Sequence, residues 1–154
     1  NLGRYSGEYF EQAQEKYTYI SQLRTVEGEE LYGIKDLLSD FFKAFSSLDA
    51  KDIEKYTNPT LDYFFDAEYQ DSKLIADSVK TALNKQKVKE ITYVPLTDSI
   101  EVIQDNKGIY IINLSLKVEK TAIDRKKKKE VNSYPIKMEL NNERQITSLT
   151  KLVK

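Results

Sequence analysis

The sequence contains no cysteine and no histidine. Without cysteine, the chain has neither disulfide bonds nor a thiol nucleophile. Without histidine, it lacks the side chain that most often transfers protons near neutral pH and binds zinc. Tryptophan is absent too, and there are only three prolines and five glycines. Enzymes that depend on cysteine or histidine are therefore excluded, whereas chemistry based on carboxylates and tyrosines is not.

The balance of charge and the absence of long apolar runs limit the partners. The chain has 24 Lys and Arg against 25 Asp and Glu, so its net charge is −1 and no overall field attracts nucleic acid. No apolar run reaches the roughly 18–20 residues that cross a bilayer, and no secretory signal peptide is found. Because the sequence begins with Asn1 rather than Met, we expect a fragment or a processed form, with any membrane anchor upstream.

What is present suffices for one folded domain. The chain has 154 residues, of which 40% are hydrophobic and 32% are charged, a composition typical of a globular domain with its own core. Neither an internal repeat nor a linker divides it. We expect a lead-in segment and helix over residues 1–30, and a single α+β domain over residues 31–154.

The first helix is predicted over residues 8–23, because its apolar residues recur at helical spacing. Tyr9, Phe10, Tyr17 and Ile20 lie on its apolar side, and tyrosine is enriched at protein interfaces. These four residues are therefore a candidate interface. The alternative is that this helix packs on its own domain.

A central helix is predicted over residues 31–48, the segment with the widest apolar stripe. Its apolar residues recur at steps of three and four: Leu31, Ile34, Leu37, Leu38, Phe41, Phe42, Phe45 and Leu48. Asp49 then follows as the N-cap of a third helix that reaches Tyr56. We expect Phe41, Phe42 and Phe45 to form the helix side of the core.

Two further helices are predicted before residue 88. Asn58 and Pro59 are typical of a helix start, and the short helix after them would bury Leu61, Phe64 and Phe65. Asp71 would cap a longer helix through Lys85. The residues predicted to face inward from that helix are Leu74, Ile75, Val79, Ala82 and Leu83.

After residue 88 the apolar pattern changes from helical to alternating, which predicts strands. Four strands are expected, over residues 91–104, 110–118, 134–140 and 146–153. Pro95 cannot donate a hydrogen bond to a neighbouring strand, so we expect a bulge or a sheet edge there. The predicted fold is α+β, with N-terminal helices packed on a curved, four-stranded antiparallel sheet.

The central helix and the closing strand carry a resemblance to known proteins. The matching residues are Leu37, Leu38, Phe41, Phe42, Lys43, Ala44, Phe45, Leu48, the Asp49-Ala-Lys-Asp52 crossing and the final strand over residues 145–153. The order of helices and strands resembles the nuclear transport factor 2-like, cystatin-related cone. Within that fold, residues 31–153 resemble the TcpC-like family of conjugation proteins from Gram-positive mobile elements. These are similar to the bitopic assembly factors of type IV secretion systems. A tryptophan is often found in their closing strand, and this chain has none.

The resemblance implies a non-enzymatic scaffold. The chain would be the soluble, extracytoplasmic part of a membrane-anchored component of a conjugative transfer channel, on the cell-surface side of the membrane. Its expected partners are other transfer-channel proteins and, in a homo-oligomer, further copies of itself. No catalytic residue, cofactor, metal ion or nucleic acid is expected, and membrane contact would come only through a segment outside this chain.

The cone fold also admits a second function, because some proteins that share it hold a small molecule and use carboxylates and tyrosines as acid-base groups. The candidates are Asp62, Tyr63, Asp66 and Tyr110. Alternatively, Tyr110 packs in the core while Asp62 and Asp66 face water from a short helix. A pocket lined by unpaired carboxylates would favour the small-molecule binder or enzyme. A filled cone with an exposed apolar patch would favour the scaffold.

Arg125 and the four lysines after it form a basic run between two predicted strands. Such a run suits contact with the phosphates of DNA or lipid headgroups, or a solvated hairpin tip that hinders aggregation. Nearby Glu119, Asp124 and Glu130 dilute its charge, so we expect the solvated tip. The acidic residues show no calcium-loop spacing, and no metal site is predicted.

Overall fold

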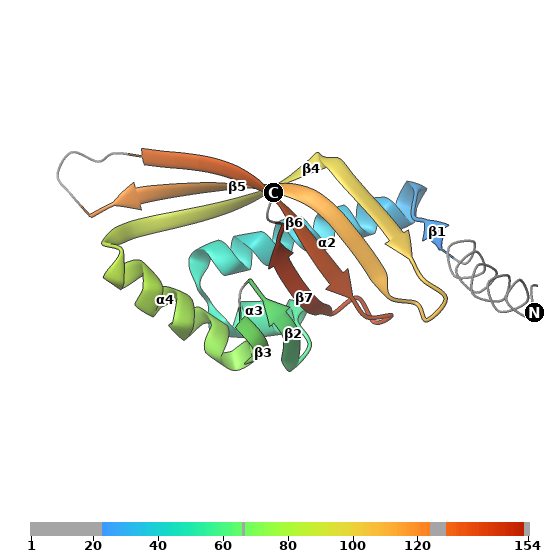
Figure 1. The fold of residues 1–154 in the computed structure, drawn as a ribbon, viewed down its shortest axis with the longest axis horizontal. Coiled ribbons are helices and arrows are strands. Elements are labelled where there is room, and N and C mark those ends of the chain that lie inside the picture. Colours follow the sequence, from blue (N-terminus) through green and yellow to red (C-terminus); the bar gives the residue numbers. More distant parts are fainter. Residues whose placement is uncertain (1–22, 66, 124–128, 153–154) are drawn as a thin grey trace, which may run out of the picture.

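The computed structural model describes residues 23–65, 67–123 and 129–152. Its elements are β1 (Arg24–Thr25), α2 (Gly28–Ser47), α3 (Ala50–Tyr56), β2 (Thr60–Phe64), β3 (Ala67–Asp71), the 3₁₀ turn η1 (Ser72–Leu74), α4 (Ile75–Lys85), β4 (Val88–Gln104), β5 (Tyr110–Ala122), β6 (Lys129–Leu140) and β7 (Ile146–Lys151). The strands form one sheet in the order β1-β4-β5-β6-β7-β2-β3 (Figure 1). The α+β class is confirmed, but the sheet has seven strands among the described residues rather than four.

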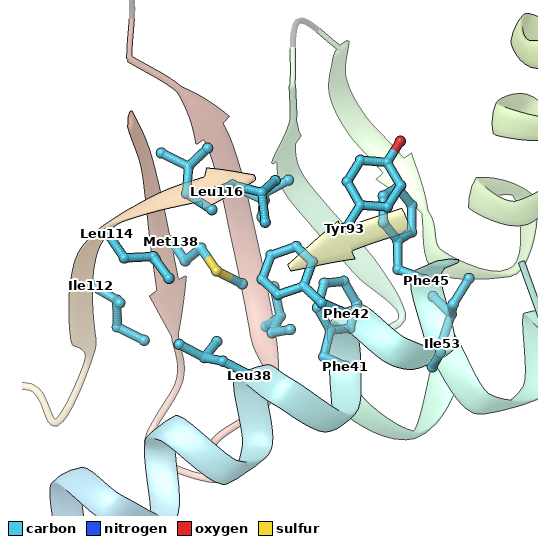
Figure 2. Packing of buried hydrophobic residues seen from close by; sticks show 14 of the residues in the cluster. Leu38, Phe41, Phe42, Phe45, Ile53, Tyr93, Ile112, Leu114, Leu116 and Met138 are labelled. Carbon is cyan, nitrogen blue, oxygen red and sulfur yellow. The ribbon is translucent and has the colours of Figure 1, made fainter. Parts of the chain in front are cut away.

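Helix α2 lies across the concave face of the sheet and supplies one side of the core. It begins at Gly28, whose φ of 65° suits glycine, earlier than the predicted start at residue 31. Its fully or almost fully buried side chains are Ile34, Leu38, Phe41, Phe42 and Phe45. Figure 2 shows this stripe facing inward side chains of the sheet, among them Ile112, Leu114, Leu116 and Met138. The predicted core role of the three phenylalanines is confirmed.

The chain breaks between α2 and α3 through local backbone geometry. Leu48 adopts the left-handed conformation, with φ at 57°, and its N–H donates to the Phe45 carbonyl. Asp49 then accepts hydrogen bonds from the N–H groups of Lys51 (3.0 Å) and Asp52 (3.2 Å), which confirms it as the N-cap of α3. The turn lets α3 cross below the core and bury Ile53.

Residues 60–71 form the β2–β3 hairpin, and the short helix predicted after Pro59 is wrong. Strand β2 runs parallel to β7, with Tyr63 opposite Ser148 and Phe64 opposite Leu149. The Phe65 N–H extends this contact by donating to the Leu149 carbonyl at 2.7 Å. A helix here would leave the edge of β7 without these hydrogen bonds, so pairing with a distant strand overrides the local helical spacing.

Strand β4 is long and runs through Pro95 without ending. Its register with β5 shifts between Leu96 and Glu101, so the predicted bulge near Pro95 is confirmed. The Tyr93 N–H donates to the Ser46 Oγ of α2 at 2.8 Å. In this part of β4, the N–H groups of odd-numbered residues therefore point away from β5, towards the open edge of the strand. Pro95 shares that parity and lacks an N–H, so this edge offers few donors to another strand.

Helix α4 lies at the end of the molecule opposite β1 and precedes β4 (Figure 1). Asp71 accepts a hydrogen bond from the Lys73 N–H at 2.9 Å, and the first turn is 3₁₀ before the α-helix starts at Ile75. Leu74, predicted to face inward, is 57% exposed because it lies in that 3₁₀ turn. In the described part of the chain, no helix combines the length and apolarity needed to cross a membrane.

Candidate ligand-binding site

A cavity of about 770 Å³ lies beneath α4, between this helix, the end of β2 and the concave face of the sheet. Its lining comes from all these parts of the fold: Phe45, Phe64, Phe65, Ser78, Val79, Ala82, Leu83, Gln86, Ile91, Tyr93, Val118, Lys120, Asn132, Ser133, Tyr134 and Lys151. The cone is therefore not filled at this end.

The cavity stays open because α4 is packed at its two ends and not in its middle. Ile75 and Ala76 are buried at the start of the helix, and Leu83 is buried near its end. Between them, Val79 is only half-buried and Ala82 is exposed. Ala82 was predicted to be buried, but its side chain is too short to reach the sheet across the cavity that it lines.

Aromatic rings form one wall of the cavity. Phe45 meets Tyr93 with ring centroids 4.4 Å apart and Phe64 at 5.5 Å. Phe64 in turn packs edge to face against Phe65 at 4.9 Å. In Figure 2 the Tyr93 hydroxyl points away from Phe41 and Phe42, while its ring packs beside Phe45. The wall is thus continuous with the core on one side and open to the cavity on the other.

Two tyrosine hydroxyls belong to this lining. Burial raises the pKa of Tyr93, and the nearby Tyr134 adds a smaller rise; burial also raises the pKa of Tyr134. Both groups therefore stay protonated at neutral pH and can donate hydrogen bonds. Among the described residues, neither hydroxyl forms a hydrogen bond with another side chain or a carbonyl. An oxygen that was both buried and without a partner would be an exception in this structure, and neither hydroxyl oxygen is one. Neither hydroxyl is therefore fully buried, and both tyrosines belong to the cavity lining.

The charged groups of the lining are two lysines. Lys120 Nζ lies 3.5 Å from Gln86 Oε1, and Lys151 Nζ lies above the Tyr134 ring, 4.4 Å from its centroid. Among the described residues, no carboxylate belongs to the lining. Strand parity is a sequence signal for Lys120, because this residue shares the inward parity of Leu116 and Val118. Neither lysine was among the residues predicted from the sequence, where the candidates were carboxylates and tyrosines.

The carboxylates and tyrosines proposed from the sequence do not gather in this cavity. Asp62 is exposed and Tyr63 is 46% exposed, both on strand β2 rather than on a helix. Asp66 lies outside the described residues. Tyr110 is buried, as the packing alternative predicted, and its hydroxyl donates to Glu30 Oε2 at 2.8 Å. The described candidates therefore do not form one acid-base site.

Glu30 is the centre of a polar cluster that the sequence did not reveal. Arg24 donates to both Glu30 oxygens, at 2.8 and 2.9 Å, and also contacts the Gln104 side chain. These bonds, led by the one from Arg24 and followed by the one from Tyr110, lower the Glu30 pKa from 4.5 to about 2. The cluster fastens β1 and the start of α2 to β5, far from the cavity, and we interpret it as structural.

Two other predictions concern residues at or beyond the limits of the description. The candidate interface of Tyr9, Phe10, Tyr17 and Ile20 lies outside the described residues. So do Arg125 and the three lysines after it. Lys129, assigned to the basic tip, is the first residue of β6 and pairs with Glu119 at 3.0 Å. Over the described ranges, no three acidic side chains are arranged to hold a metal ion.

A second hollow of about 710 Å³ adjoins the cavity along the outer edge of β4. The two share Leu83, Ile91 and Tyr93 in their linings. Ser46 and Pro95 line this second hollow, and both leave the edge of β4 with fewer free hydrogen-bond donors.

We take the cavity beneath α4 as the candidate site because it combines an aromatic wall with two lysines.

Solved structures share the fold over most of the chain. Aln2 from a Streptomyces species superposes with a TM-score of 0.65 at 10% identity, over 82% of this chain and 93% of Aln2. A nuclear transport factor 2-like superfamily protein from Salmonella enterica serovar Typhimurium gives 0.62 at 6% identity, over 79% and 89%. SalBIII, an epoxide hydrolase/cyclase-like enzyme of pyran ring formation in salinomycin, gives 0.54 at 15%, over 79% and 90%.

These likenesses establish a nuclear transport factor 2-like fold, as the resemblance implied. No family model and no curated protein matches the sequence. Membership of the TcpC-like family therefore stays a prediction, and the structural neighbours, at such low identity, bring no function with them.

Proposed function

We propose that this nuclear transport factor 2-like domain is a non-enzymatic binding protein that takes up a small, largely apolar molecule in its cone. The observation that carries the proposal is the cavity of about 770 Å³ with its aromatic wall. Pockets that enclose small ligands typically measure about 300–1,000 Å³ and are mostly apolar with a few polar groups. A bound molecule would remove the rings of Phe64 and Phe65 from water, and such burial is favourable.

Binding is proposed instead of catalysis because of what lines the cavity. A general base near neutral pH is usually a histidine or a carboxylate; the chain has no histidine, and the described lining has no carboxylate. Tyr93, with its raised pKa, is a donor and not a base. SalBIII is an epoxide hydrolase/cyclase-like enzyme on the same fold, but chemistry comes from the site and not from the fold.

The proposal is tested with N-phenyl-1-naphthylamine, a neutral apolar dye whose fluorescence rises when it leaves water. We expect saturable binding to the parent domain. Ala82→Trp should abolish it, because the indole fills the cavity that Ala82 lines. The matched control is Asn84→Trp, an exposed α4 position that lies outside the lining and should leave binding unchanged. Equal binding to all three proteins would contradict a ligand site in the cone.

A scaffold in a conjugative transfer channel is the second candidate function. Beyond the resemblance to the TcpC-like family, it is favoured by exposed apolar side chains at one end of the sheet: Tyr63 (46%), Tyr69 (74%) and Leu74 (57%). They accompany β3, which in the described part of the chain pairs only with β2 and so leaves its outer edge open. Exposed apolar groups beside an open strand edge suit contact with another protein. On this proposal the domain is extracytoplasmic and associates with channel proteins or with itself.

Self-association, one form of the scaffold proposal, is tested by sedimentation over a wide concentration range. We expect the mass to rise with concentration and to return to that of a monomer in Tyr69→Ser. The control is Tyr32→Ser, because Tyr32 is similarly exposed (66%) but belongs to α2. A monomer at every concentration would contradict self-association through β3 and leave only contact with other proteins.

A further inference from the structure

We infer that the molecule bound in the cone is a flat aromatic anion, attracted by the positive charges of Lys120 and Lys151. This inference rests on the proposed binding function and specifies the chemistry of its ligand. It concerns a feature that an apolar ligand would not require, namely two positive charges in a lining whose described residues include no negative one.

The sheet places the two lysines on opposite sides of β6. Lys120 belongs to β5 and lies opposite Glu130, whereas Lys151 belongs to β7 and lies opposite Ile136. Tyr134 of β6 shares the inward face with both lysines but lies nearer to Lys151, whose ammonium is above its ring at 4.4 Å. Lys120 lies further along the sheet, because Tyr134 is opposite Leu116 and Lys120 is opposite Glu130. A ligand against Tyr134 would therefore have the Lys151 ammonium beside it, and Lys120 would add a second positive charge further along the cavity lining.

Lysines on the outer face of the sheet, in contrast to Lys120 and Lys151, contact acidic side chains. On the outer face, Lys117 pairs with Glu119 at 3.1 Å, and Lys137 approaches Glu139 at 3.9 Å. Lys129 joins the first of these acids at 3.0 Å. On the inner face, neither Lys120 nor Lys151 forms an ion pair with another described residue; their contacts are an amide oxygen and a ring.

Glu130 is the acidic residue of the described chain that lies opposite Lys120, and the two form no ion pair. Its Oε1 accepts a hydrogen bond from Asn132 Nδ2 at 2.9 Å, and its side chain is not part of the cavity lining. An ammonium group favours an anion over a neutral ligand, because a charge-assisted hydrogen bond is stronger than a neutral one. Tyr93 and Tyr134, which line the same cavity, carry hydroxyls that can add donors for this anion.

The aromatic wall indicates a flat ligand. Phe64, Phe65 and Tyr93 contribute faces and edges within one continuous cluster, and aromatic pairs gain energy beyond simple burial when they stack offset or meet edge to face. An aryl carboxylate satisfies both features, with its ring against the wall and its negative charge in the positive field of the two lysines.

A structural explanation of the lysines makes a different prediction. Lysine side chains often cover apolar surface with their methylene chains while the ammonium stays in water, and Lys151 above Tyr134 fits that description. If the lysines only cover the rings, a neutral ligand of the same shape should bind as well as the anion.

The experiment compares 2-naphthoate with its neutral isostere 2-naphthamide, by calorimetric titration of the parent domain. We expect the acid to bind on the order of tenfold more tightly than the amide. In the double variant Lys120→Gln/Lys151→Gln, naphthoate binding should fall to the level of the amide while amide binding stays unchanged. Lys120→Arg/Lys151→Arg should keep the preference for the acid. Lys117→Gln, on the outer face of β5, is the matched control and should behave like the parent.

The outcomes separate this inference from the proposed function. Equal affinity for the acid and the amide, both abolished by Ala82→Trp, would overturn the anion and leave the binding function intact. A preference for the acid that survives the double Gln variant would overturn the role of the two lysines. Absence of naphthoate binding overturns the inference; if the neutral dye also fails to bind, the binding function falls with it.

Discussion

Phe45 belongs both to the core and to the wall of the cavity. It is fully buried and stacks on Phe41 with centroids 5.9 Å apart, while its ring also contacts the cavity residues Phe64 and Tyr93. We expect Phe45→Ala to lower the free energy of unfolding by about 3–5 kcal/mol, through lost burial and the space left behind. Urea unfolding monitored by circular dichroism measures this.

Phe41→Ala and Phe42→Ala should cost a similar amount, because both rings are buried against the sheet. Three variants that unfold like the parent would contradict the assignment of α2 as the central helix.

Glu30 gives a pH dependence to stability. Its pKa in the folded domain is about 2 against an ordinary 4.5, so the folded state binds this proton less tightly than the unfolded chain does. The stabilisation is therefore complete above about pH 4.5 and lost as the pH falls towards 2. Glu30→Gln should be less stable than the parent at neutral pH, modestly because the group is exposed to screening, and the two should converge in acid.

Urea unfolding from neutral pH into acid tests this difference. Glu29→Gln, an exposed neighbour without the Arg24 contact, is the charge-matched control and should follow the parent. A gap between Glu30→Gln and the parent that stays constant with pH would show that the carboxylate charge does not stabilise the cluster.

At the scale of elements, α4 should tolerate bulk in its middle and not at its start. Ala82 faces the cavity and is exposed, whereas Ala76 is 1% exposed. We expect Ala82→Leu to change stability by less than about 0.5 kcal/mol, and Ala76→Leu to destabilise by about 1–3 kcal/mol through overpacking. Thermal unfolding of both variants measures the contrast, and equal destabilisation would mean that the helix packs on the sheet along its whole length.

The elements that sequence patterns predicted are those with long, regular periods. Helix α2 is 20 residues long and β5 is 13, and each buries residues at the spacing of its own type. The β2–β3 hairpin was assigned to a helix because Leu61, Phe64 and Phe65 also fit helical spacing. Its strand structure depends on β7, which is distant in the sequence, and β1 has only two residues. The residue pattern within such a short segment carries no information about the distant strand with which it pairs.

At the scale of the whole molecule, protection should follow the order of strands in the sheet. Strand β5 pairs with β4 and β6 over most of its length, whereas β3 pairs only with β2 among the described strands. We expect amide hydrogens of β5 to exchange slowest and those of β3 and β1 to exchange fastest, because opening a sheet edge requires less of the structure to unfold. Hydrogen exchange followed by mass spectrometry or NMR measures this. Slow exchange in β3 would contradict an open edge.

The candidate site was harder to predict from the sequence than the fold. Its lining joins Phe45 to Lys151 through segments scattered between them, so no motif spans it. The inward parity of Lys120 was visible in the alternation of β5, but its partner Lys151 is placed only by the pairing of β7 with β6. The predicted acid-base candidates were Asp62, Tyr63, Asp66 and Tyr110, and the three described ones, Asp62, Tyr63 and Tyr110, lie outside the cavity lining.

Helix α4 is held by buried residues at its two ends, and this affects how the binding site of the domain can change in evolution. Since burial at the two ends of the helix holds it in place, Ser78 and Ala82 in the middle contribute side chains to the cavity without supporting the fold. Mutations there can reshape the space beneath the helix at little cost to folding. A lineage carrying this domain could therefore change what it binds through a few substitutions in one helix, while the packing of α2 on the sheet stays under selection.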